Sequence, residues 1–188
     1  MGSRLTKRKM GGEGSKISPK DLKDVKANTE FDSKEIKTWY KDFSQSCPEG
    51  KLGKKEMAMM FTNLFPDGDP DTFTENVFRT YDTNGDGSVD FREFMIGISV
   101  TSRGSFDEKL KWAFELYDQD NNGSISKEEA IDIITAVQKM HGTAEQSPGE
   151  LVDKMFESFD LNKDGKLSKE EFIEGSRKDP SFTKMLEW

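Results

Sequence analysis

The sequence has little of several features that many protein classes need. In 188 residues it contains one cysteine, Cys47, and one histidine, His141. One cysteine excludes an intrachain disulfide and favours a reducing compartment such as the cytosol. No segment approaches the roughly 20 consecutive apolar residues of a membrane-spanning helix, and we expect no secretion signal. Since the sequence also shows no catalytic constellation, we do not expect an enzyme.

The charge is acidic overall but unevenly distributed. The formal net charge is −8. Residues 1–26 carry eight Lys or Arg and three Asp or Glu, a net charge of +5, which leaves −13 for residues 27–188. This basic arm suits an anionic membrane surface, and a solvated flexible tail accounts for the charges equally well. We expect no nucleic-acid partner.

Three twelve-residue segments follow the pattern D-x-[DN]-x-[DN]-G-x5-E, which is typical of an EF-hand calcium loop. We call them the second loop (82–93), the third loop (118–129) and the fourth loop (160–171). Calcium is a hard cation that takes six to eight oxygen ligands, which such a loop offers from positions 1, 3, 5, 7, 9 and 12. The glycine at position 6 permits a sharp turn, and the apolar residue at position 8 suits a short strand. The sequence therefore predicts calcium binding at three sites.

The predicted ligands are the side chains at positions 1, 3, 5, 9 and 12 and the main-chain carbonyl at position 7. They are Asp82, Asn84, Asp86, Ser88, Asp90 and Glu93; Asp118, Asp120, Asn122, Ser124, Ser126 and Glu129; and Asp160, Asn162, Asp164, Lys166, Ser168 and Glu171. The second loop has four acidic ligands and the others have three each, so we expect Glu93 to matter most for opening the N-terminal lobe. Affinities of about 10⁻⁷–10⁻⁵ M are typical of sensor loops. Magnesium is a candidate occupant at resting calcium, although its octahedral demand suits a bidentate glutamate poorly.

An earlier segment keeps the spacing of such a loop without its chemistry. Counting back from Glu56 as position 12 defines a first loop (45–56) that starts at Gln45 and has Gly50 at the turn. Gln45 is neutral, and Cys47 offers soft sulfur where hard oxygen is needed. Pro48 restricts the backbone within the loop. We interpret this segment as a structural EF-hand without bound metal.

The four loops predict an all-α fold of four EF-hands paired into two lobes, with short antiparallel strands between paired loops. Apolar residues at helical spacing lie on either side of each loop, and Asp32 with Glu35 marks the start of the first of these helices. We expect a basic arm over residues 1–26, an N-terminal pair over 27–100, a linker over 101–105, and a C-terminal pair with a C-terminal helix over 106–188. Each lobe is expected to have its own core.

The N-terminal lobe has more large apolar side chains than one small lobe should bury. Core packing is the simpler interpretation for most apolar residues, but methionine is flexible and suits surfaces that accept varied partners. We therefore predict a groove that opens with calcium and binds an amphipathic helix of a protein target. Its predicted lining residues are Trp39, Tyr40, Phe43, Met57, Met60, Phe61, Phe65, Phe78 and Phe94.

The arm carries two alternative lipidation signals. Residues 1–6 and 10–15 both fit M-G-x-x-x-[ST], the N-myristoylation pattern. Gly2 is the predicted acceptor, and Gly11 is the alternative if translation starts at Met10. One myristoyl chain binds a membrane only marginally, and a polybasic segment is a common second signal.

These residues resemble the neuronal calcium sensor family, which includes recoverin, frequenin, hippocalcin, neurocalcin and the visinin-like proteins. The marks of the resemblance are Trp39-Tyr40-Lys41, Cys47-Pro48-x-Gly50, Phe65-Pro66-x-Gly68, residues 99–104, residues 109–114 and Asp179-Pro180-Ser181. Three complete loops resemble the hippocalcin–neurocalcin branch. The resemblance implies four EF-hands, N-myristoylation, calcium-dependent extrusion of the lipid to a membrane, and docking of kinases, cyclases or channel segments. In the family the acylated glycine aligns with Gly11, which makes residues 1–9 an extension.

Three functions fit these observations. We favour a cytoplasmic calcium sensor with calcium-dependent peripheral membrane association. A soluble calcium buffer would use the same loops with little opening. A constitutive subunit similar to the calcineurin regulatory chain would also have EF-hands and a myristoylation site, but the degenerate first loop argues against it. A monomer and a homodimer are both compatible with the sequence.

Overall fold

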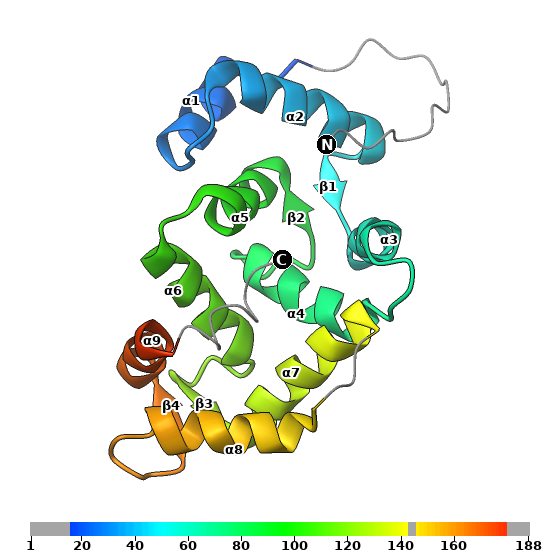
Figure 1. Ribbon diagram of the computed structural model, residues 1–188. Coiled ribbons are helices and arrows are strands. Elements are labelled where there is room, and N and C mark those ends of the chain that lie inside the picture. The colour runs from blue at the N-terminus through cyan, green and yellow to red at the C-terminus, as the bar shows by residue number, and fades with distance from the viewer. Residues whose placement is uncertain (1–15, 143–145, 180–188) are drawn as a thin grey trace.

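The computed structural model describes residues 16–142 and 146–179 (Figure 1). Within these ranges the elements, in chain order, are α1 (Pro19–Ala27), α2 (Ser33–Ser46), β1 (Lys51–Leu52), α3 (Lys54–Leu64), α4 (Asp71–Tyr81), β2 (Val89–Asp90), α5 (Phe91–Arg103), α6 (Phe106–Tyr117), β3 (Ser124–Ser126), α7 (Lys127–His141), α8 (Pro148–Phe159), β4 (Lys166–Ser168) and α9 (Lys169–Lys178). The predicted all-α fold is confirmed. None of these helices is both long and apolar enough to cross a membrane.

In the described part of the chain, four helix–strand–helix units follow α1. We call them the first hand (α2–β1–α3), the second hand (α4–β2–α5), the third hand (α6–β3–α7) and the fourth hand (α8–β4–α9). Figure 1 shows α1 and α2 at one end of the molecule and α8 at the other. The last part of the segment predicted as the C-terminal pair and C-terminal helix, residues 180–188, lies outside the described residues.

Local sequence signals determine where several helices begin. Asp32 is the N-cap of α2, where its carboxylate accepts a hydrogen bond from the Glu35 amide at 2.9 Å and the Glu35 side chain accepts one from the Asp32 amide. Such a reciprocal pair satisfies two amides that the first helical turn leaves without partners. The helix start predicted at Asp32 is confirmed.

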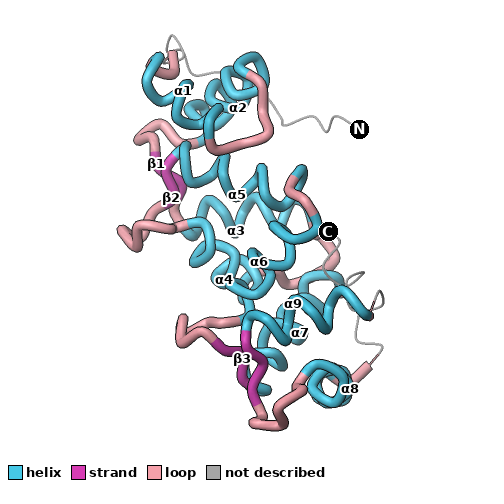
Figure 2. Tube along the Cα trace, turned by 90° about the vertical axis from the view of Figure 1, so that its left-hand side faces the viewer, coloured by secondary structure: helices cyan, strands magenta, loops and turns pink. Residues whose placement is uncertain are grey.

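Short antiparallel strands join the hands into two pairs. Leu52 lies opposite Val89 in the first pair, and Ile125 lies opposite Leu167 in the second. All four side chains are buried, so the apolar residue at position 8 of each loop anchors the strand that the spacing predicts. Figure 2 shows both strand pairs toward the same side of the molecule. The calcium loops are therefore held in pairs by backbone hydrogen bonds and apolar contacts.

The two pairs of hands share one core, so the expectation of a separate core for each lobe is wrong. One continuous cluster of buried apolar side chains includes residues from both pairs, and α4 packs against both α6 and α7. The connector between the pairs is also shorter than the predicted 101–105. Helix α5 continues to Arg103, Gly104 follows as its C-cap, and Ser105 is already the N-cap of α6. So short a connection keeps the two pairs in contact.

Part of the predicted basic arm belongs to the folded body. Helix α1 starts after Ser18, whose hydroxyl accepts a hydrogen bond from the Asp21 amide at 3.1 Å. Val25 is fully buried, and Asp24 forms an ion pair with Arg92 of α5. Helix α1 thus packs against α2 and α5, and the boundary predicted at residue 26 falls too late.

Candidate calcium sites

The first predicted ligand of each complete loop ends the helix that enters it. Asp82, Asp118 and Asp160 are the C-caps of α4, α6 and α8. In each loop this aspartate accepts a hydrogen bond from the amide of the glycine at position 6, at 2.9, 3.0 and 3.0 Å respectively. The chain therefore folds back over the carboxylate as soon as the helix ends, which places the loop around it.

In each complete loop, two residues adopt the left-handed backbone conformation. Positions 4 and 6 have φ angles between +56° and +86° in all three loops, at Gly85 and Gly87, Asn121 and Gly123, and Lys163 and Gly165. Glycine reaches this region without steric cost, and asparagine tolerates it better than most residues. The glycine at position 6 is thus explained by backbone conformation, since a Cβ would meet no neighbour there.

The glutamate at position 12 reaches back across each loop. One of its oxygens accepts a hydrogen bond from the amide at position 2 or 3, with donor–acceptor distances of 3.2 Å for Glu93, 2.8 Å for Glu129 and 3.2 Å for Glu171. The other oxygen accepts from the amide at position 9, which is the N-cap of the exit helix. The same side chain is therefore a predicted metal ligand and part of the cap that starts the exit helix.

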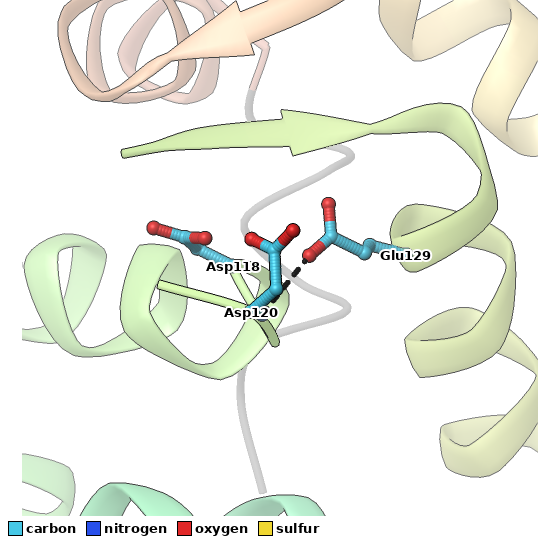
Figure 3. A group of neighbouring side chains, drawn as sticks. All are labelled: Asp118, Asp120 and Glu129. Carbon is cyan, nitrogen blue, oxygen red and sulfur yellow. Dashed lines mark hydrogen bonds between the residues drawn. The ribbon is translucent and has the colours of Figure 1, made fainter. Parts of the chain in front are cut away.

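The structure brings three predicted ligands of the third loop together. One carboxylate oxygen from each of Asp118, Asp120 and Glu129 lies within 4.8 Å of the other two. Figure 3 shows the three carboxylates side by side, from the C-cap of α6, the loop and the first turn of α7, with the Asp120 amide donating to Glu129. Hydrogen bonding from Asn122 is the main cause that lowers the pKa of Asp120. Three carboxylates this close together form a strongly negative cluster that a divalent cation would neutralise.

The fourth loop contains a buried oxygen without a donor. Among the described residues, Oδ1 of Asp160 is buried and has no hydrogen-bond partner. A buried carboxylate oxygen left in this state is costly unless a cation or a donor satisfies it. Burial raises the pKa of Glu171, but hydrogen bonds from Ser168, Asn162 and Leu161 outweigh it, and the net pKa is lowered. An ionised, oxygen-only donor set fits calcium.

The second loop differs because a cation from another hand contacts it. Nζ of Lys51 lies 2.8 Å from Oδ2 of Asp86. That contact, followed by hydrogen bonding from Ser88, lowers the pKa of Asp86 to about 2. Glu93 is buried and also accepts a hydrogen bond from the Thr83 hydroxyl at 3.0 Å. All eighteen predicted ligands lie in the three loops or in the first turn of an exit helix.

The first loop has a different shape as well as different side chains. Helix α2 continues to Ser46 and its C-cap is Cys47, which corresponds to position 3 of the loop. From this C-cap to the next N-cap, Gly53, the chain advances six residues, whereas Asp82 to Asp90 spans eight. Pro48 at position 4 cannot adopt positive φ. Burial, and then the charge of Glu56, raises the pKa of the Cys47 thiol.

The nine predicted groove residues do not form one open surface in this structure, and a groove that opens with calcium stays a prediction. Phe43, Met57, Phe78 and Phe94 are buried, Tyr40, Phe61 and Phe65 are half-buried, and Trp39 and Met60 are 36% and 41% exposed. Phe43 and Phe94 are buried because their rings pack together, with centroids 5.3 Å apart. The sequence reasoning missed Met59 and Leu64, which are 59% and 68% exposed. The sequence feature that could have identified them is that the α3 segment has apolar residues on more than one face.

Helix–loop–helix units with oxygen-rich loops, paired through short strands, define an EF-hand calcium-binding protein. Residues 107–177 match the family described as an EF-hand domain pair, and residues 75–97 match the one described as EF hand. The chain is 43% identical to neuronal calcium sensor 1 of Lymnaea stagnalis, over 94% of this chain and 96% of that protein. It is 37% identical to S-modulin of Aquarana catesbeiana, over 92% and 89%, and 34% identical to recoverin of Homo sapiens, over 92% and 90%.

The chain therefore belongs to the neuronal calcium sensor family, as its motifs predicted. This membership also confirms that it is not an enzyme. Its placement in the hippocalcin–neurocalcin branch stays a prediction.

Proposed function

We propose that this protein is a calcium sensor that binds calcium at the second, third and fourth loops and regulates a membrane-associated protein target. The observation that carries the proposal is the double role of the position-12 glutamates. Because Glu93, Glu129 and Glu171 both face their loops and cap the exit helices, a shift of the carboxylate toward a cation changes how the helix begins. Magnesium is the candidate occupant at resting calcium.

Helix α5 connects the second loop to the proposed target surface. Glu93 lies in its first turn, and Phe94 follows directly. The Phe94 ring contacts Trp39 and Phe43 of α2, with centroids 5.9 and 5.3 Å apart. A reorientation of α5 therefore separates rings that now cover one another. The exposed Trp39, Met60 and Leu64 side chains supply apolar surface beside them for an amphipathic helix of a kinase, cyclase or channel.

Membrane attachment is the second part of the proposal. Gly2, its alternative Gly11 and the basic residues before Lys16 lie outside the described residues. The proposal is supported by the acylation pattern, the basic arm and the family of the chain. We expect the protein in the cytoplasm at resting calcium and on an anionic membrane when calcium rises.

Co-sedimentation with anionic liposomes tests this function. Protein co-expressed with an N-myristoyltransferase, with the lipid located by intact mass, should pellet with calcium and stay in solution with a chelator. Unmodified protein is the matched control and should stay in solution in both conditions. Equal pelleting with and without calcium would contradict a switch and indicate a permanent anchor.

A soluble buffer is the alternative that the same samples can identify. A sensor should increase the fluorescence of a hydrophobic dye when calcium is added, because its apolar surface becomes accessible. A buffer should barely change it. Absence of both pelleting and the dye response would favour the buffer.

A further inference from the structure

A lysine from the first hand lies within the ligand set of the second loop. Lys51 forms β1 with Leu52, and its ammonium nitrogen is 2.8 Å from Oδ2 of Asp86, the predicted ligand at position 5. The two side chains are 55% and 41% exposed. The contact joins two different hands, because Lys51 belongs to the degenerate first loop and Asp86 to the complete second loop.

The strand pairing determines the position of this lysine. Lys51 lies opposite Asp90 in the β1–β2 ladder, and the buried pair Leu52 and Val89 fixes the register. A slip of one residue would turn these apolar side chains toward solvent. The hydrogen bond and charge of Asp86 raise the pKa of Lys51, and Asp90 and Glu93 add to the effect. Three of the four acidic ligands of the second loop therefore act on one ammonium group.

The C-terminal pair has a lysine at the corresponding strand position but not the same contact. Lys166 of β4 lies opposite Ser126 of β3. After hydrogen bonding from Asn122, which dominates, the charge of Lys166 is a minor cause of the lowered pKa of Asp120. Among the described residues, Lys51 forms an ion pair with the predicted ligand Asp86, whereas Lys166 forms no ion pair with a predicted ligand. The direct contact thus distinguishes the second loop from the third.

We propose that Lys51 makes the degenerate first hand an internal competitor for the second calcium loop, lowering the calcium affinity of that loop below what its four carboxylates would give. The inference rests on the proposed function, specifically on calcium binding at the second loop. A calcium ion near Asp86 must either displace the ammonium group or stay beside it. Either outcome lowers the calcium affinity of the loop. Displacement breaks the Lys51–Asp86 ion pair, and retention of the ammonium group places like charges a few ångströms apart.

The expected size of the effect follows from exposure. A half-exposed ion pair is screened by water and salt, and by itself contributes little. Repulsion of a divalent ion is about twice that of a monovalent one at the same distance. We therefore expect removal of the lysine charge to tighten calcium binding at the second loop by about threefold to tenfold.

The test follows each loop separately in one protein. In a calcium titration of the full-length ¹⁵N-labelled chain, the amide resonances of Gly87, Gly123 and Gly165 report the second, third and fourth loops. In Lys51→Gln, the Gly87 midpoint should move to about threefold to tenfold lower free calcium, while the other two midpoints stay within about twofold. Lys51→Arg should behave as the wild type because the charge remains.

Lys55→Gln is the matched control. Lys55 lies in the exposed first turn of α3, so the variant removes the same charge from the same hand without touching the Lys51–Asp86 pair. An unchanged Gly87 midpoint in Lys51→Gln would overturn the inference, and so would an equal shift in Lys55→Gln. If Gly87 of the wild type does not respond to calcium, the proposed function fails instead. Lys51→Met repeats the test if the spectrum of metal-free Lys51→Gln shows a lost fold.

Discussion

Replacing Glu93 with glutamine should lower calcium affinity at the second loop by about 100-fold and prevent opening of the N-terminal pair. A neutral amide cannot supply the two carboxylate oxygens that calcium requires at position 12. Glutamine has nearly the same shape and keeps a carbonyl oxygen that can accept from the Asn84 or Asp90 amide, which Glu93 now holds at 3.2 and 3.0 Å. The metal-free fold should therefore survive while binding is lost.

The Gly87 amide resonance and calcium-dependent dye binding together measure this prediction. Glu56→Gln is the control, because Glu56 occupies position 12 of the first loop, which we propose does not bind calcium. That variant should leave the Gly87 midpoint and the dye response unchanged. Calcium-dependent opening that persists in Glu93→Gln would contradict the proposed role of the second loop.

Replacing Arg79 with alanine should lower the free energy of unfolding of the metal-free protein by about 2–4 kcal/mol. Arg79 of α4 donates hydrogen bonds to the main-chain carbonyls of Glu115, Leu116 and Asp118, at 2.9, 2.9 and 3.1 Å. These carbonyls lie at the C-terminal end of α6, where helical partners are lacking and the helix dipole is negative. Burial lowers the pKa of Arg79, and the charges of Asp118, Glu129 and Glu115 oppose this shift.

Urea unfolding of metal-free protein, followed by circular dichroism, measures the effect. Arg92→Ala is the control, because Arg92 forms a half-exposed ion pair with Asp24 and exposed pairs contribute about 0–1 kcal/mol. If both variants lose the same stability, the Arg79 contacts are no stronger than an ordinary surface pair. The Arg79 contacts would then not explain how α4 and α6 are held together.

The loops and their strands could be predicted because their signals are local. The D-x-[DN]-x-[DN]-G spacing reflects hydrogen bonds and positive φ angles within twelve residues, and the paired strands follow from the apolar residue at position 8. The start of α2 at Asp32 is equally local. Each of these features depends on residues that are close in sequence, so the pattern of residue types determines them.

Features that depend on packing between distant segments could not be predicted in this way. Helix α1 is mostly polar and has few apolar residues, such as Leu22 and Val25, so its periodicity is weak. The shared core depends on how α4 packs against α6 and α7, which no single segment encodes. The exposure of the predicted groove residues depends on the same packing, because residue type does not show whether Phe43 is buried or Met59 is exposed.

Calcium stoichiometry is the measurement that tests the central claim most directly. Native mass spectrometry of the full-length chain across a calcium titration should show three bound ions per chain at saturation, and it also shows whether the protein is a monomer or a homodimer. At the calcium concentration that saturates the wild type, Glu93→Gln should bind two calcium ions per chain. A saturated wild-type chain with fewer than three ions, or with a fourth, would contradict the assignment of three calcium-binding loops and one that does not bind.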